Sequence, residues 1–139
     1  MTEALRTFNQ KIIDEFRANQ GVVGEPFAGT PLMLLGTLGA KSGERRINPL
    51  AYIVDGEDLI IAASFAGADQ HPPWYFNLVA DPKVSVEVGA DTYEAEAIVV
   101  DEPERTRLYT AMETQMSTFT SYREKTQRPI PVIRLRKIV

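Results

Sequence analysis

The chain has 139 residues, a formal net charge of −4 at pH 7 and no cysteine. A single domain of this length buries about two thirds of the surface that its unfolded chain exposes, so neither a metal nor a disulfide is needed for stability. The lack of cysteine excludes disulfides, thiolate catalysis and cysteine-based metal sites, and the acidic balance argues against nucleic-acid binding. No signal-like start and no run of about 18 apolar residues is present, which predicts a cytoplasmic protein.

The first predicted element is an amphipathic helix over residues 2–19. Its apolar residues share one helical stripe: Leu5, Phe8, Ile12, Ile13 and Phe16. We expect this stripe to cover a barrel or sheet, or a partner subunit. Peripheral membrane contact through residues 2–19, and hence association of the cytoplasmic protein with a membrane, is an alternative, although the polar face has mixed charge rather than a basic bias. Monomer and homodimer both stay open.

From Leu32 onward, short apolar runs of strand length replace the helical period. Six strands are predicted: Leu32–Leu38, Ile47–Val54, Leu59–Ser64, Val84–Val88, Tyr93–Val100 and Pro131–Ile138. Short connections favour an antiparallel meander, with the last strand at an edge, that forms a small closed or half-closed barrel. The sequence therefore predicts one mainly β domain over residues 1–139, with flanking helices.

The connection between the first two strands is rich in glycine and basic residues. Gly39 and Gly43 can adopt positive φ, which turns backbone N–H groups toward one point, and Lys41, Ser42, Arg45 and Arg46 add side-chain donors. This pattern favours a site for a small anion such as a phosphate or carboxylate. A solvated hairpin that binds nothing is the alternative.

Two further helices are predicted. Pro73 can open a short helix over Trp74–Ala80, where three adjacent aromatic residues must point in different directions, so that Trp74 faces either a cleft or the core. Pro103 and nearby acidic residues begin a helix that runs to about Tyr122. His71, the sole histidine, lies in a proline-rich loop and is interpreted as a surface residue, so no metal site is predicted.

Taken together, several segments resemble the deazaflavin-dependent nitroreductase family. The motifs that carry the resemblance are Thr30-Pro31, Gly39-x-Lys41-Ser42-Gly43-x-x-Arg46-x-Asn48-Pro49-Leu50, Ala62-Ala63-Ser64, Pro73-Trp74-Tyr75-x-Asn77-Leu78 and Asp81-Pro82-x-Val84. The resemblance implies a split β-barrel, similar to FMN-binding split barrels, that binds reduced coenzyme F420 and passes hydride to quinones or nitroaromatic compounds. Lys41 and Arg46 would contact the phosphate and carboxylates of the cofactor tail.

The resemblance also implies a set of site residues. Its cofactor site would comprise Ala40, Lys41, Ser42, Arg45, Arg46, Ile47, Asn48, Pro49, Leu50, Ala51, Ala62, Ala63, Ser64, Phe65, Pro73, Trp74, Tyr75, Phe76, Asn77 and Phe119. Ala40 and Phe65 stand where basic residues are usual in the family, and Arg45 is a candidate to compensate. Met116, Phe119 and Tyr122 would form the wall that faces the acceptor, and Ser64 or Tyr122 would hydrogen-bond the acceptor or supply a proton.

The functional prediction is an oxidoreductase that transfers hydride from reduced coenzyme F420 to a quinone-like or other small organic acceptor, with weak or absent nitroimidazole reduction. Met116 and Phe119 stand where hydroxyl-bearing rings would favour a nitro group. Two alternatives are an FMN-binding split-barrel oxidoreductase and a non-catalytic F420-binding protein.

Overall fold

The computed structural model describes residues 3–139, so Thr2 of the predicted first helix lies outside the described part. The helices are α1 (Glu3–Ala18), α2 (Pro73–Ala80), α3 (Glu104–Gln115) and α4 (Thr118–Lys125), and a 3-10 turn, η1 (Phe65–Gly67), precedes α2. The strands are β1 (Leu32–Leu38), β2 (Arg45–Ala51), β3 (Ile53–Asp55), β4 (Asp58–Ala62), β5 (Lys83–Val88), β6 (Asp91–Val99) and β7 (Val132–Lys137). Within residues 3–139, no helix is long and apolar enough to cross a membrane.

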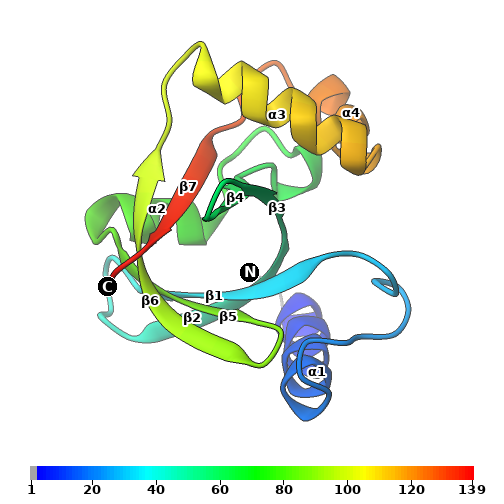
Figure 1. Cartoon of the computed structure of the whole chain (residues 1–139), viewed down its shortest axis with the longest axis vertical. Helices are drawn as coiled ribbons and strands as arrows, with labels where there is room; N and C mark the ends of the chain where they lie inside the picture. Colours follow the sequence, from blue (N-terminus) through cyan, green and yellow to red (C-terminus); the bar gives the residue numbers. More distant parts are fainter. Residues whose placement is uncertain (1–2) are drawn as a thin grey trace.

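The seven strands form one antiparallel sheet in the order β2-β1-β5-β6-β7-β4-β3. β2 and β3 occupy opposite edges of this sheet, yet Tyr52 alone separates them in the chain. The sheet must therefore curl until its edges approach one another, which produces the antiparallel half-barrel of Figure 1. The predicted fold class is confirmed, but the single predicted strand over 47–54 is wrong, because the chain leaves one edge at Tyr52, whose N–H donates to the Pro31 carbonyl.

The C-terminal strand lies inside the sheet, between β6 and β4, and not at the predicted edge. Its side chains explain this position, because both of its faces are covered. Ile133 and Leu135 point into the barrel interior, whereas Val132 packs on the opposite side, under α3 and α4. The apolar run of β7 therefore indicates a strand buried on two faces.

Alternation along the strands divides the core into three parts. Residues such as Met33, Leu35 and Ile61 fill the barrel interior, which α2 closes with Trp74 and Leu78. On the outer face, α3 and α4 cover one region and α1 covers another.

The helix α1 packs on the barrel of its own chain. Its buried residues Ile12, Ile13 and Phe16 contact a cluster that includes Leu32 and Leu34 of β1. The barrel therefore covers the C-terminal half of the apolar stripe, whereas Phe8 in the N-terminal half is 38% exposed.

The predicted long helix over 102–122 breaks at Met116, where φ is −139° and ψ is 100°. Ser117 and Thr118 follow the break, and such residues hydrogen-bond locally and weaken a helix. α4 then folds back on α3, held by the Tyr109 hydroxyl, which donates to the Phe119 carbonyl at 2.6 Å, and by the ion pair of Arg123 with Glu113.

Candidate functional site

Two adjoining cavities lie at the side of the half-barrel where its edge strand β2 passes between helices. The first, here called the basic groove, has a volume of about 920 Å³ and separates α1 from α2 along β2. It is lined by Arg6, Asn9, Gln10, Ile13, Gly39, Ala40, Lys41, Ser42, Arg45, Arg46, Ile47, Asn48, Pro73, Trp74, Phe76 and Asn77.

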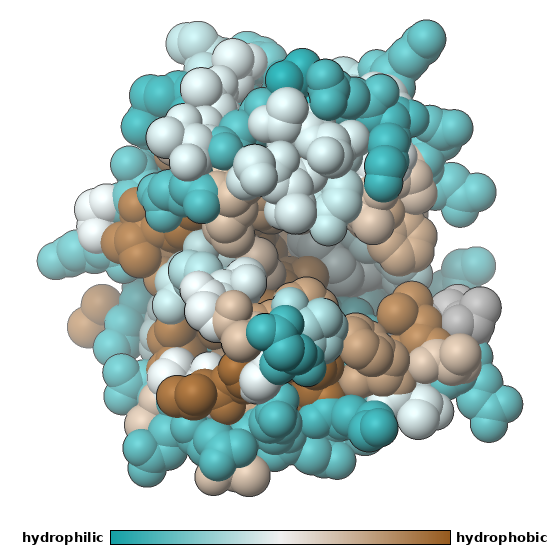
Figure 2. All heavy atoms as spheres, turned by 90° about the vertical axis from the view of Figure 1, so that its right-hand side faces the viewer, coloured by the Kyte–Doolittle hydropathy of each residue, from teal (hydrophilic) through white to brown (hydrophobic). Residues whose placement is uncertain are grey.

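The second cavity, here called the aromatic cavity, has a volume of about 620 Å³ and lies between the barrel and the α3–α4 junction. It is lined by Leu5, Asn9, Pro26, Phe27, Thr30, Leu32, Asn48, Pro49, Leu50, Ala51, Ala62, Ser64, Phe65, Ala66, Pro72, Pro73, Trp74, Gln115, Met116, Ser117, Thr118, Phe119 and Tyr122. In Figure 2 a recess opens between the end of the molecule that carries α3 and α4 and the end that carries α1. Because Asn9, Asn48, Pro73 and Trp74 line both cavities, the two form one elongated site.

The Gly-rich turn does not form the concave array of backbone N–H groups that the sequence predicted. Gly43 adopts positive φ (72°), as expected, but Gly39 does not. The N–H groups of Gly39 and Gly43 donate to carbonyls within the turn, and the Ala40 N–H donates to the Asn77 side chain at 2.9 Å. Most of the backbone donors are thus used internally, so the turn offers an anion its side chains instead of a concave array of N–H groups.

The cationic side chains of the basic groove differ in their availability. The side chains of Lys41 and Arg6 make no hydrogen bond or ion pair within residues 3–139, whereas Arg46 pairs with Glu44 at 3.3 Å and Arg45 donates to the Ser85 hydroxyl at 2.8 Å. Lys41 and Arg6 are therefore the cations most available to a ligand, one from the turn between β1 and β2 and the other from α1.

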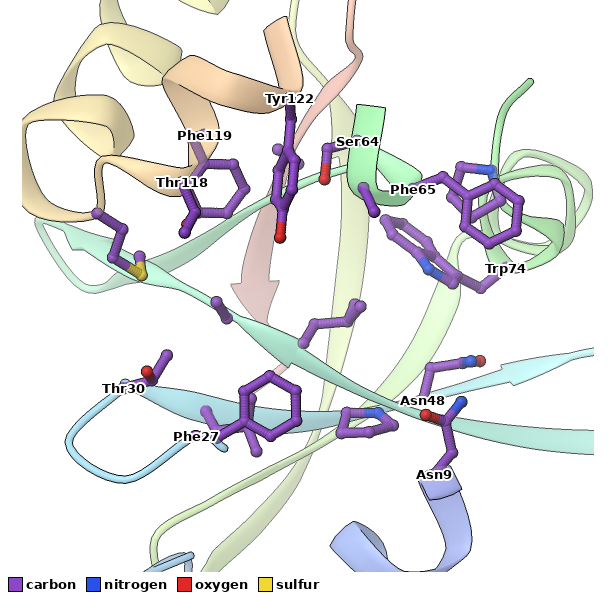
Figure 3. A pocket seen from close by; sticks show the side chains of 18 of the residues that line it. Asn9, Phe27, Thr30, Asn48, Ser64, Phe65, Trp74, Thr118, Phe119 and Tyr122 are labelled. Carbon is purple, nitrogen blue, oxygen red and sulfur yellow. The ribbon is translucent and has the colours of Figure 1, made fainter. Parts of the chain in front are cut away.

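The aromatic cavity has few polar groups directed into it. Figure 3 shows the Tyr122 ring projecting into the cavity with its hydroxyl foremost, next to Phe119 and across from Phe27. Ser64 lies on the wall beside Phe65 and Trp74, and Asn9 and Asn48 lie close together at the end that leads to the basic groove. This arrangement suits a planar apolar molecule that accepts hydrogen bonds at its rim.

Tyr109 of α3 fixes the position of α4, which forms one wall of the aromatic cavity. Only 3% of this residue is exposed, and burial, reinforced by the negative charge of Glu113, raises its pKa to about 12. Its neutral hydroxyl donates to the Phe119 carbonyl, and the Phe119 ring packs edge-to-face against both Tyr109 and Tyr122. Although Met116, Phe119 and Tyr122 do not share one helical stripe as predicted, the fold brings all three to the aromatic cavity.

Most of the predicted site residues line one of the two cavities, but Ala63 and Tyr75 do not. Ala63 is completely buried in the barrel core, and Tyr75 packs against that core and against His71. Trp74 satisfies both interpretations, since it belongs to the core cluster, is 5% exposed and still lines both cavities. Asn77 lines the groove, but its side chain already accepts a hydrogen bond from the Ala40 N–H and donates one to the Thr37 hydroxyl.

Sequence reasoning missed the contribution of α1 and of the loop before β1. Arg6, Asn9 and Gln10 of α1 line the groove, and Phe27 and Thr30 line the aromatic cavity. A signal was present in the helix, because positions 6, 9, 10 and 13 follow helical spacing and place three polar side chains on one stripe. In the loop, Thr30 belongs to the Thr30-Pro31 motif but was given no role in the site, and Phe27 carried no signal. In the described part of the chain, no cluster of three or more potential metal-ligating residues occurs.

Together, fold and site define a split-barrel protein whose elongated site is basic at one end and aromatic at the other. The model of the F420H2-dependent quinone reductase family matches residues 8–137. An F420H2-dependent quinone reductase of Mycobacterium tuberculosis is 35% identical over 122 residues, which cover 85% of this chain and 82% of that protein.

Solved structures agree with these matches. An F420-H2 dependent reductase superposes with a TM-score of 0.71 at 34% identity, covering 76% of this chain and 94% of that one. A second structure, described as a domain-swapped dimer, has a TM-score of 0.73 at 30% identity and covers 96% of this chain and 98% of that one. The chain belongs to the F420H2-dependent quinone reductase family, whose cofactor is coenzyme F420, and the predicted recognition is confirmed.

Proposed function

We propose that this protein transfers hydride from reduced coenzyme F420 to a quinone-like acceptor bound in the aromatic cavity. The observation that carries the proposal is the continuity of the basic groove with the aromatic cavity through Asn9, Asn48, Pro73 and Trp74. A ligand with an anionic tail and a planar ring needs this combination of charge at one end and apolar surface at the other. When bound, the reduced deazaflavin supplies the hydride.

The basic groove would hold the anionic tail. Lys41 and Arg6 form no ion pair within residues 3–139, whereas Arg46 already pairs with the exposed Glu44. Arg45 is held by Ser85 and is a weaker candidate for compensating the basic residues that are usual at positions 40 and 65. The ring would then lie near Asn48 and Trp74, where groove and cavity join.

The aromatic cavity would hold the acceptor against Phe27, Met116 and Phe119. Reduction of a quinone to a hydroquinone needs one hydride and one proton, and Tyr122 and Ser64 carry the hydroxyl groups able to hydrogen-bond the acceptor oxygen or relay a proton from solvent. Met116 and Phe119 offer no hydrogen-bond donor from their side chains. A nitro group would therefore lack donors at these positions, whereas a quinone ring would keep its apolar contacts there. We therefore propose weak or absent reduction of nitroimidazoles.

Binding and turnover with purified protein test this function. Titration with coenzyme F420 and with FMN should quench deazaflavin fluorescence and leave flavin fluorescence unchanged. Reduced F420 mixed with a soluble naphthoquinone should then be oxidised at a rate proportional to protein concentration, whereas a bicyclic nitroimidazole should be consumed at least about tenfold more slowly. Binding of FMN alone would favour the flavin alternative, and F420 binding without turnover of any acceptor would indicate a non-catalytic binding protein.

Oligomeric state and location belong to the same proposal. The 30% identical relative described as a domain-swapped dimer supports a homodimer over a monomer, and sedimentation of the purified chain tests this. A cytoplasmic location and any membrane contact through α1 stay predictions, which cell fractionation would test.

A further inference from the structure

The turn that carries Ser64 into the aromatic cavity has an unusual backbone. Phe65, Ala66 and Gly67 follow one another with φ values of 48°, 55° and 82°. Residues with a Cβ rarely adopt this left-handed conformation, because the Cβ crowds the following carbonyl oxygen. Two such residues in sequence persist only when the surrounding structure holds them.

Arg128 makes the contacts that hold this turn. Its Nη2 donates to the carbonyls of Ala63 and Ser64 at 3.1 and 2.9 Å, and its Nε donates to the Ala68 carbonyl at 2.8 Å. One guanidinium thus joins the residues before the turn to the residue after it. Because a guanidinium is planar and has fixed donor directions, these bonds fix the distance between the two ends of the turn.

The remaining contact of the guanidinium is with His71, whose Nδ1 lies 3.0 Å from Nη1. Arginine has no acceptor, so Nδ1 must accept, and His71 is neutral with its proton on Nε2. Burial, followed by the neighbouring positive charge of Arg128, lowers the pKa of His71, in agreement with this state. Arg128 makes no ion pair within residues 3–139, so its guanidinium donates only to carbonyls and an imidazole, with Asp69 as a negative charge farther away.

The turn also touches the opposite wall of the cavity. A Cβ on Gly67 would lie 2.9 Å from the Tyr122 carbonyl and 2.9 Å from the Lys125 Cβ, so η1 and α4 are in direct contact. Thr126, just after α4, donates to Asp69, just after the turn, at 2.9 Å. The position of the turn therefore also determines how closely Ser64 and Phe65 face Tyr122.

We propose that Arg128 is a positioning residue, which holds the 64–67 turn in its left-handed conformation and thereby sets the spacing between Ser64 and Tyr122 across the aromatic cavity. The effect on catalysis rests on the proposed function, whereas the effect on the turn does not. Arg128 lines neither cavity, so it acts through the turn and not on the acceptor.

Hydrogen exchange of the cofactor-free protein tests the first half of the proposal. The Gly67 and Ala68 N–H groups donate to the Ser64 and Phe65 carbonyls and report directly on the turn. In Arg128→Met these two amides should exchange at least about tenfold faster than in the wild type. In Arg128→Lys, which keeps the charge but loses the planar set of guanidinium donors, the increase in exchange rate should be intermediate. Arg17→Gln is the matched control, because Arg17 pairs in a bidentate fashion with Glu87 between α1 and β5, away from the turn.

Kinetics and a second-site variant test the other half. Arg128→Met should lower kcat for quinone reduction by about 10- to 100-fold, because displacement of positioned groups is costly, while the Kd for coenzyme F420 changes less than about threefold. Ala66→Gly makes the left-handed conformation easy to adopt, so the loss of kcat caused by Arg128→Met should be at least about threefold smaller in the Ala66→Gly background than in the wild-type background.

These outcomes separate the possible failures. Unchanged exchange at Gly67 and Ala68 in both Arg128 variants, or no rescue by Ala66→Gly, would overturn the positioning role. A protein that turns over no acceptor, but shows the predicted exchange pattern, would overturn the proposed function and leave the hold on the turn intact. Should Arg128→Met fail to fold, Arg128→Lys with and without Ala66→Gly decides the same question.

Discussion

The hydroxyl of Tyr109 should stabilise the junction between α3 and α4, and Tyr109→Phe removes that hydroxyl without changing the ring. The hydroxyl is buried and donates to the Phe119 carbonyl at 2.6 Å. Loss of a buried hydrogen bond costs about 1–2 kcal/mol, and the Phe119 carbonyl keeps a second lone pair, which argues against a larger value. For a domain of this size the melting temperature should fall by roughly 3–6 °C.

The same residue predicts a pH dependence with a defined sign. The folded-state pKa of Tyr109 is raised from 10.0 to about 12, so the unfolded chain loses the phenolic proton first as pH rises. The contribution of this hydroxyl is therefore complete below pH 10 and is lost as pH rises from 10 toward 12. At pH 11, one unit above the unfolded-state pKa, the unfolding free energy of the wild type should have fallen by about 1.4 kcal/mol. The variant has no phenolic group at this position and should show no such fall.

Urea unfolding of both proteins at several pH values measures these quantities. The difference in unfolding free energy should be constant from pH 7 to about 9 and should approach zero near pH 11. Tyr122→Phe is the matched control, since its hydroxyl makes no hydrogen bond within residues 3–139, and it should change stability by less than about 0.5 kcal/mol. A difference that persists unchanged at pH 11, or equal losses in the two variants, would refute the argument.

Three further predictions concern the site. Lys41→Ala should weaken binding of coenzyme F420 by about 1–3 kcal/mol at low salt, and by less at high salt. Arg46→Ala should have a smaller effect, because Glu44 already pairs with Arg46. Affinity titrations check both variants, and an equal loss in Lys11→Ala, a lysine outside the groove, would point to a general charge effect. Trp74 fluorescence should be quenched by saturating cofactor, and an unchanged spectrum would restrict this residue to a role in the core. Tyr122→Phe should lower kcat/KM for a naphthoquinone by about 5- to 50-fold, and steady-state rates equal to those of the wild type would remove its hydroxyl from the reaction.

The charge network around Arg134 shows how a tertiary arrangement escapes prediction. This residue alternates with apolar neighbours on β7, which by itself suggests a solvent-facing position at an edge. In the fold it is joined to Asp55, Asp58 and Glu104, which come from a hairpin and a helix, and these contacts raise its pKa further above the ordinary arginine value. No local pattern links residues so distant in the chain.

Composition and local pattern determined much of this protein. The spacing of apolar residues predicted α1 and most strands to within a few residues, and Pro73 predicted the start of α2. The ordered motifs from Thr30 to Val84 predicted the split barrel and the cofactor, and they include many of the residues that line the two cavities. These features follow from interactions between residues that are close in the chain, or from motifs that resemble those of a known family, so the sequence displays them directly.

Only the tertiary structure decided the rest. The position of β7 between β6 and β4 depends on strand pairing over long chain separations, and the break at Met116 depends on α4 packing back against Tyr109. Likewise, α1 reaches the basic groove only because its apolar stripe has a place to pack on the outside of β1 and β2. Long-range packing selects among arrangements that local propensities leave equally favourable, and for that reason the partners of a residue cannot be read from its neighbours in the chain.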